Sequence, residues 1–161
     1  MDSRDGPLDT RVKDIVQSKS ALTEAGGVLT TAPTATVFEC IDRMVDRDVG
    51  SIVVMDGESI AGIFTERDYM RNIALKGRSS KNTEVREVMT SDVATVTPEK
   101  PLVECLRLMT ELRCRHLPVV AEEEDELLGI VSIGDGVKRI VKTAEAETAR
   151  LQQYISGSYP G

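Results

Sequence analysis

The residues best suited to chemistry are a hydroxyl and a carboxyl group three positions apart, and this pair occurs twice. Thr65 precedes Asp68, and Ser132 precedes Asp135, each directly after an apolar run that contains glycine. An ionised aspartate can accept hydrogen bonds from both ribose hydroxyls, while the nearby hydroxyl and the first amides of a helix face a phosphate. The same spacing is also a helix-capping signature. Both interpretations are open, and recurrence at matching points favours a nucleotide site.

Further side chains could contact the phosphates or the sugar. Arg115 and His116 precede an apolar run, and the planar guanidinium suits phosphate oxygens. An ion pair for Arg115 and a structural role for the imidazole are the alternatives. Thr30 and Thr95 end short extended segments, where their hydroxyls could reach ribose or phosphate, but core packing explains the segments equally well.

Enzyme and metal motifs are missing from the sequence. It contains no nucleophile elbow, P-loop, HExxH or GxGxxG pattern, and its single histidine leaves little for acid–base chemistry. The cysteines Cys40, Cys105 and Cys114 have no CxxC spacing, which indicates reduced thiols. The acidic run 122–126 lacks calcium-loop spacing and predicts a solvated turn. We expect no enzyme, no metal site and no required cofactor.

Composition narrows the class of protein further. The 161 residues suffice for one compact domain, and a net charge of -7 disfavours nucleic acid as a partner. No apolar run approaches the roughly 18 to 20 residues of a membrane span, and residues 1–11 lack the apolar core of a secretory signal. We therefore expect a soluble protein with no membrane partner, cytoplasmic or in an organelle interior.

An internal repeat organises the chain. Residues 28–33 align with residues 93–98, and the register continues without a gap through the next helix and strand. After a longer turn in the second copy, residues 62–63 align with 129–130. The matched residues are Glu39 with Glu104, Cys40 with Cys105, Met44 with Met109, Val54 with Val119, Asp68 with Asp135 and Ile73 with Ile140.

Each copy predicts the order strand, helix, two strands, helix, which is an α/β fold. Apolar spacing in residues 37–45 and 102–109 is typical of one buried helical face, and residues 56–58 form a hairpin signal. We predict a tail (1–10), repeat 1 (11–75), a linker (76–83), repeat 2 (84–142) and a C-terminal helix with a tail (143–161). The last helix keeps an apolar stripe from residue 138 to 155, beyond the end of its own repeat at residue 142. A second subunit could cover this stripe, which favours a homodimer.

With these features the chain resembles a pair of CBS domains. The resemblance rests on the repeated order, on residues 115–120 and on the closing pattern Gly-Ile-x-Ser/Thr-x-x-Asp at 62–68 and 129–135. More narrowly, it is similar to small bacterial and plant organellar proteins with one CBS pair and a C-terminal helix. The resemblance implies a disc-like dimer with clefts between repeats that hold AMP, ATP, NAD(H) or S-adenosylmethionine derivatives. The expected binding residues are Thr30, Thr65, Arg67, Asp68, Thr95, Arg115, His116, Ser132 and Asp135.

These observations predict a regulatory sensor of an adenine nucleotide that acts on an unidentified protein partner. The two sites are expected to differ, because Gly50 stands where the second copy has Arg115, and Arg67 stands where it has Gly134. The alternative is a scaffold for dimerisation or partner binding that takes no ligand.

Overall fold

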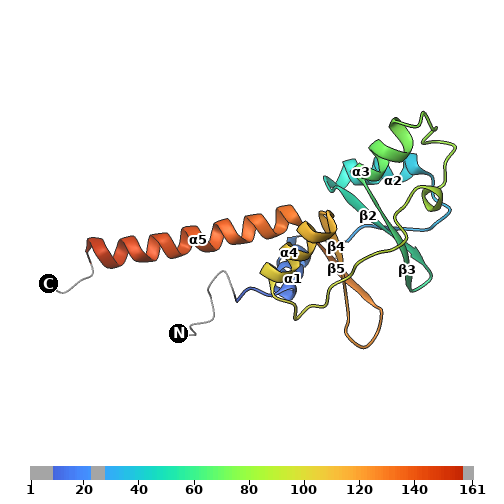
Figure 1. Cartoon of the computed structure of the whole chain (residues 1–161). Coiled ribbons are helices and arrows are strands. Elements are labelled where there is room, and N and C mark those ends of the chain that lie inside the picture. Colours follow the sequence, from blue (N-terminus) through green and yellow to red (C-terminus); the bar gives the residue numbers. More distant parts are fainter. Residues whose placement is uncertain (1–8, 23–27, 158–161) are drawn as a thin grey trace.

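The computed structural model describes residues 9–22 and 28–157, and it confirms the α/β fold of two repeats followed by a helix (Figure 1). The first copy follows helix α1 (Val12–Leu22). It contains strand β1 (Thr30–Thr31), helix α2 (Val37–Arg47), strands β2 (Ser51–Asp56) and β3 (Ser59–Thr65), and helix α3 (Glu66–Tyr69), which continues as a π-helical turn, Met70–Ala74. After a 3₁₀ turn (Val85–Glu87) come α4 (Leu102–Leu112), β4 (His116–Val120), β5 (Leu127–Ser132) and α5 (Ile133–Ser156).

The two sheets follow the repeat but differ in one strand. In the first copy the order is β1-β2-β3, with β1 parallel to β2 and β3 antiparallel to it. In the second copy β4 and β5 form an antiparallel pair, and the segment expected to match β1 is reduced to one parallel bridge between Val96 and Val119. Each hairpin shifts register at the same point of the repeat, after Val54 and after Val119.

The segment that precedes each copy packs on the other copy. Val12 and Ile15 of α1 are buried in the core of the second copy, against Leu102, Met109 and Val131. Val85 and Val88, which precede the second copy, are buried in the core of the first. A third cluster around Val53, Ile63 and Ile130 joins the two copies. The copies are therefore intertwined, because the core of each copy includes a segment that adjoins the other copy in the sequence.

Matched glycines allow this close packing. An added Cβ on Gly62 would lie 2.8 Å from the carbonyl oxygen of Thr90, and one on Gly129 would lie 3.0 Å from a methyl group of Val16. Both glycines face the segment that comes from outside their own copy. A side chain at either position would therefore push the exchanged segment away from the sheet.

We expect Gly62→Ala to lower the free energy of unfolding by about 1–3 kcal/mol, as overpacking of a close contact does. The matched control is Gly134→Ala in α5, where the nearest atom to an added Cβ is Ser132 Oγ at 3.7 Å. Alanine there should be neutral or stabilise by about 0.4–1 kcal/mol. Urea unfolding of both variants measures the difference, and equal stability would contradict the packing described.

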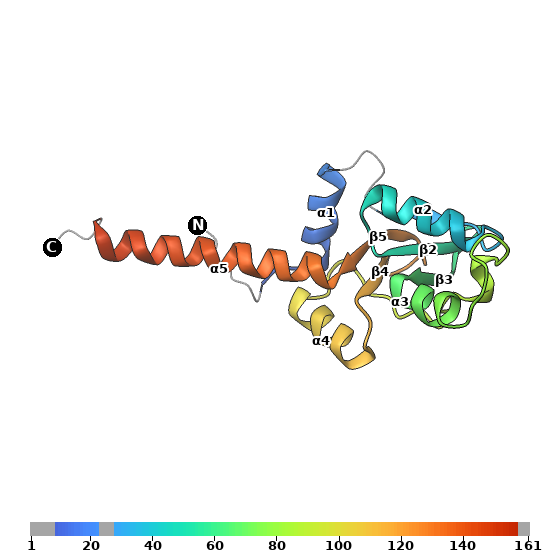
Figure 2. The same cartoon turned by 90° about the horizontal axis from the view of Figure 1, so that it is seen from above.

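Helix α5 extends beyond the body of the molecule. Its first turns lie against α1 and α4, and the rest projects outward in both views (Figures 1 and 2). Every residue from 145 to 156 is exposed, including Leu151 and Ile155. Within the described ranges, none of the helices is long and apolar enough to span a membrane.

Candidate functional site

Both hydroxyl–carboxyl pairs form capping boxes at the first turn of a helix. At α3, Asp68 N–H donates to Thr65 Oγ1 (3.3 Å) and Thr65 N–H donates to Asp68 Oδ2 (3.0 Å). At α5, Asp135 N–H donates to Ser132 Oγ (3.1 Å) and Ser132 N–H donates to Asp135 Oδ2 (2.9 Å). The capping interpretation is thus confirmed for both copies. It leaves acceptor capacity for a ligand, because an ionised carboxylate has about four lone-pair sites.

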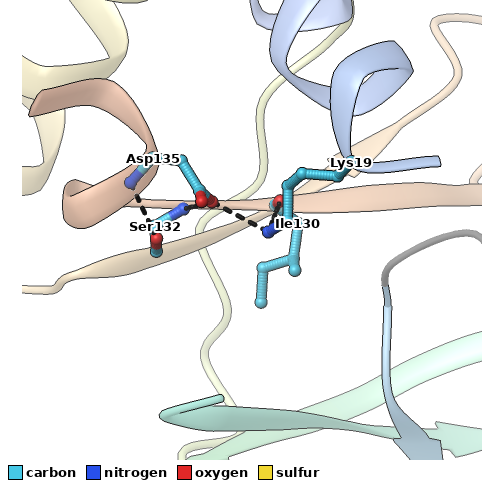
Figure 3. A network of polar contacts seen from close by, with 4 residues as sticks. All are labelled: Lys19, Ile130, Ser132 and Asp135. Carbon is cyan, nitrogen blue, oxygen red and sulfur yellow. Dashed lines mark hydrogen bonds and ion pairs between the residues drawn. The ribbon is translucent and has the colours of Figure 1, made fainter. Parts of the chain in front are cut away.

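The two aspartates differ in their third partner. Thr90 Oγ1 donates to Asp68 Oδ1 (3.2 Å), whereas Lys19 Nζ lies 2.8 Å from Asp135 Oδ2 and 3.0 Å from the carbonyl oxygen of Ile130 (Figure 3). Lys19 reaches Asp135 because α1 packs on the second copy. Burial raises the pKa of Asp135, but the hydrogen bonds from Lys19 and from the Ser132 amide outweigh it, so the pKa lies below its ordinary value.

We expect Lys19→Met to destabilise the protein by about 1–2 kcal/mol at pH 7, since it removes a charge-assisted hydrogen bond from a half-buried carboxylate. The lowered pKa means that the pair stabilises the fold above the unfolded-state value of about 3.9 and stops doing so as the pH falls through the folded-state value. The difference between wild type and variant should therefore shrink below about pH 4. Urea unfolding as a function of pH measures it.

The control for this variant is Lys13→Met on the same helix. Lys13 pairs with Glu99, but these side chains are 44% and 59% exposed, against 26% and 22% for Lys19 and Asp135. Exposed pairs typically contribute about 0–1 kcal/mol. Equal losses for the two lysines would show that the Lys19–Asp135 pair has no special role.

A cavity of about 560 Å³ lies where the two copies meet, and we call it the junction cavity. Arg115, His116 and Ser132 of the second copy line it, opposite Gly50 and the ends of α2 and α3 from the first. Gly50 makes room for the imidazole, because an added Cβ would lie 3.2 Å from His116 Nε2. The pKa of His116 is lowered by burial, then by the charges of Lys19 and Arg115, and is raised in part by Asp135. A neutral imidazole can donate one hydrogen bond to a phosphate.

A second cavity, of about 460 Å³, brings Arg67 and Arg115 together. Arg67 Nη1 donates to the carbonyl oxygen of Arg113 (3.1 Å). This hydrogen bond links α3 to the end of α4 and holds the Arg67 side chain in place. Arg115 and Ile133 line both cavities, so the two cavities are adjacent. Among residues 9–22 and 28–157, no cluster of side chains could hold a metal ion.

Comparisons with known proteins identify the repeat. The family model described as CBS domain matches residues 12–75 and again residues 85–142. The chain belongs to the CBS-domain family. It is 39% identical over 155 residues to CBS domain-containing protein CBSX3, mitochondrial, from Arabidopsis thaliana, covering 93% of this chain and 74% of that protein.

Solved structures agree on the fold of this CBS pair. A protein with CBS domains from Burkholderia ambifaria MC40-6 is 41% identical with a TM-score of 0.75, covering 83% of this chain and 95% of that one. The CBS domain pair of protein MJ0100, solved in complex with 5'-methylthioadenosine and S-adenosyl-L-methionine, is 20% identical with a TM-score of 0.67. That match covers 84% of this chain and 98% of the other, and at this identity it shows the fold alone.

The other expected binding residues lie outside both cavities of the CBS pair. Thr65, Asp68 and Asp135 line neither one; they sit in the capping boxes. Thr30 lies in β1, where its carbonyl oxygen accepts a hydrogen bond from Arg43 Nη1 (2.7 Å). Thr95 is exposed. The structure therefore places Arg67, Arg115, His116 and Ser132 around two adjacent cavities that share Arg115, and the roles of the other five residues remain predictions.

Sequence reasoning missed the two side chains that contact the expected aspartates. Lys19 and Thr90 contact the two aspartates, but both belong to segments whose packing partner the repeat does not reveal. Cys114 lines the second cavity, and burial raises the pKa of its thiol. Burial also raises the pKa of Cys40, and that of Cys105 to about 11, which fits inert packing for both core thiols.

Proposed function

We propose that this CBS pair is a sensor of an adenine nucleotide (AMP, ATP or NAD(H)) and is not an enzyme. The observation that carries the proposal is the junction cavity, where Arg115, His116 and Ser132 meet the first copy. A cavity of this size falls within the range of small-molecule sites. In this proposal the guanidinium and the imidazole N–H face phosphate oxygens in the cavity. Asp68 and Asp135 lie outside it, so each would accept the hydroxyls of a ribose that extends from the cavity towards its own capping box.

Lys19 links ligand binding to the packing of α1. A ribose at Asp135 competes with Lys19 for the carboxylate oxygens, so the ligand loosens or redirects the lysine. Since α1 completes the core of the second copy, this competition changes how the two copies pack. The resulting signal cannot exceed the difference in the ligand's affinity for the two arrangements.

The proposal includes a homodimer through the helical face. Exposed apolar side chains lie on α2, the π-helical turn, α4 and α5, and three of them, Val45, Met70 and Ile133, line the junction cavity. In this proposal a second copy covers the exposed apolar residues. These residues are Val45, Met70, Leu112, Ile133, Val137 and Val141. The regulated partner would read a change in this assembly. The Arabidopsis relative is mitochondrial by name, so we propose the cytoplasm or an organelle interior as the location.

The second candidate is a scaffold that takes no ligand. It is favoured by the capping boxes, which already engage both aspartates, and by the ion pair to Lys19. Under this alternative Asp68 and Asp135 are structural, and dimerisation or partner binding is the whole function.

A thermal-unfolding panel with AMP, ADP, ATP, NAD, NADH and S-adenosylmethionine separates the two candidates. At about 100 times its dissociation constant, a ligand stabilises the folded state by about 2.7 kcal/mol. For a chain of this size the midpoint should rise by roughly 5 to 10 °C. No rise with any of the six compounds would overturn the sensor and leave the scaffold.

A further inference from the structure

The second cavity carries an unusual concentration of positive charge. Four arginines line it: Arg67 and Arg71 from α3 and its π-helical turn, and Arg113 and Arg115 from the segment after α4. No aspartate or glutamate is among its lining residues. We call it the four-arginine cavity. The chain has a net charge of -7, so this cavity is a local region of positive electrostatic potential on an acidic protein.

The arginines are not neutralised within the described part of the chain. None of the four takes part in an ion pair there, and the one hydrogen bond from their guanidinium groups runs from Arg67 to the carbonyl oxygen of Arg113. Arginine stays protonated at physiological pH, so the cavity carries four like charges. Arg71, Arg113 and Arg115 are exposed, so water screens part of the repulsion among them. An anion that enters relieves this repulsion and gains charge-assisted hydrogen bonds.

The charge is specific to this cavity and does not follow from the repeat. Asp48 and Arg113 occupy matching positions, and both end their helix in the left-handed region, with φ of 53° and 54°. In the junction cavity Asp48 and Glu66 add negative charge to the lining. The two cavities thus have similar backbone surroundings but linings of opposite net charge. A highly charged anion would bind preferentially in the four-arginine cavity.

We propose that the four-arginine cavity binds the phosphate chain of a compact polyanion, such as a triphosphate. Three linked phosphates carry enough negative charge to meet four guanidinium groups, and their oxygens suit the guanidinium fork. The cavity volume of about 460 Å³ lies within the range of small-molecule sites. The inference rests on the proposed function only where the two share Arg67 and Arg115, and it adds Arg71 and Arg113 as binding residues.

Calorimetric titration of the full chain with inorganic triphosphate tests this assignment. The double variant Arg71→Gln, Arg113→Gln should bind triphosphate about 100-fold more weakly, because two charge-assisted contacts are lost. The control Arg107→Gln, Lys138→Gln makes the same change in net charge at residues that do not line the cavity, and should bind as wild type does. Unfolding midpoints of both variants verify that they fold.

Parallel titrations with ATP identify the source of the phosphate chain. If the double variant weakens ATP and inorganic triphosphate alike, the cavity holds a nucleotide tail; if it weakens only inorganic triphosphate, the ligand is a free polyphosphate. The inference is overturned if wild type binds no triphosphate, if the control loses as much affinity, or if the double variant only shifts a dimer towards monomer in sedimentation. AMP, with one phosphate, reports on the proposed function separately, and the double variant should retain its binding.

Discussion

Replacing Asp68 and Asp135 together by asparagine is expected to abolish the rise of roughly 5 to 10 °C that a bound adenine nucleotide gives to the unfolding midpoint. The amide is a weaker acceptor for the ribose hydroxyls than the carboxylate, because it carries no charge. Its oxygen can still accept from the Thr65 and Ser132 amides, as glutamine does in a capping box. Asparagine therefore keeps both capping boxes, which alanine cannot do. At Asp135 it also removes the ion pair with Lys19, so the rise is measured from the ligand-free midpoint of each variant.

The control for this experiment is Glu39→Gln. Glu39 closes a third capping box with Thr36 at the start of α2, and it lines neither cavity, so it undergoes the same chemical change away from the site. Asp68→Asn alone is also informative, because among residues 9–22 and 28–157 Asp68 forms hydrogen bonds but no ion pair. An undiminished nucleotide shift in the double variant would mean that the two aspartates serve only as caps.

The second large effect is expected from Ile15→Ala in α1. Ile15 is 4% exposed and packs in the core of the second copy. Truncating a buried isoleucine costs about 2–5 kcal/mol, which lowers the unfolding midpoint by roughly 5 to 15 °C. The control is Leu75→Ala, at a position 83% exposed after the π-helical turn and outside the proposed dimer face, which should change the midpoint little.

Hydrogen exchange locates where this loss occurs. Because α1 belongs to the core of the second copy, Ile15→Ala should lower amide protection in β4 and β5 more than in β2 and β3. Loss confined to β2 and β3, the strands of the copy that follows α1 in sequence, would contradict the exchanged packing.

The repeat and the order of its elements could be predicted from the sequence, because hydrophobic periodicity reports which face of a helix or strand is buried. Residues 37–45 and 102–109 show this for α2 and α4. Periodicity does not report which partner covers that face. The exchange of the segments around Ile15 and Val88 therefore emerged only from the structure, as did the single bridge at Val96 in place of a strand.

Only the part of the candidate site that lies within one helical turn could be predicted, because local sequence patterns do not report tertiary partners. The spacing of Thr65 with Asp68, and of Ser132 with Asp135, foretold the capping boxes, since both members lie within one helical turn. Lys19 meets Asp135 across distant parts of the chain, and Arg71 meets Arg113 across two elements. Such meetings depend on tertiary packing, and no local pattern encodes them.

A nuclear magnetic resonance titration of the wild-type chain with AMP tests the central claim most directly, because it shows where the nucleotide binds. A ligand held between the copies should give saturable shifts at the amides of the two capping boxes, residues 65–68 and 132–135, and at His116 in the junction cavity. No saturable shifts, or shifts confined to the exposed stretch of α5 from residue 145 onward, would contradict the account.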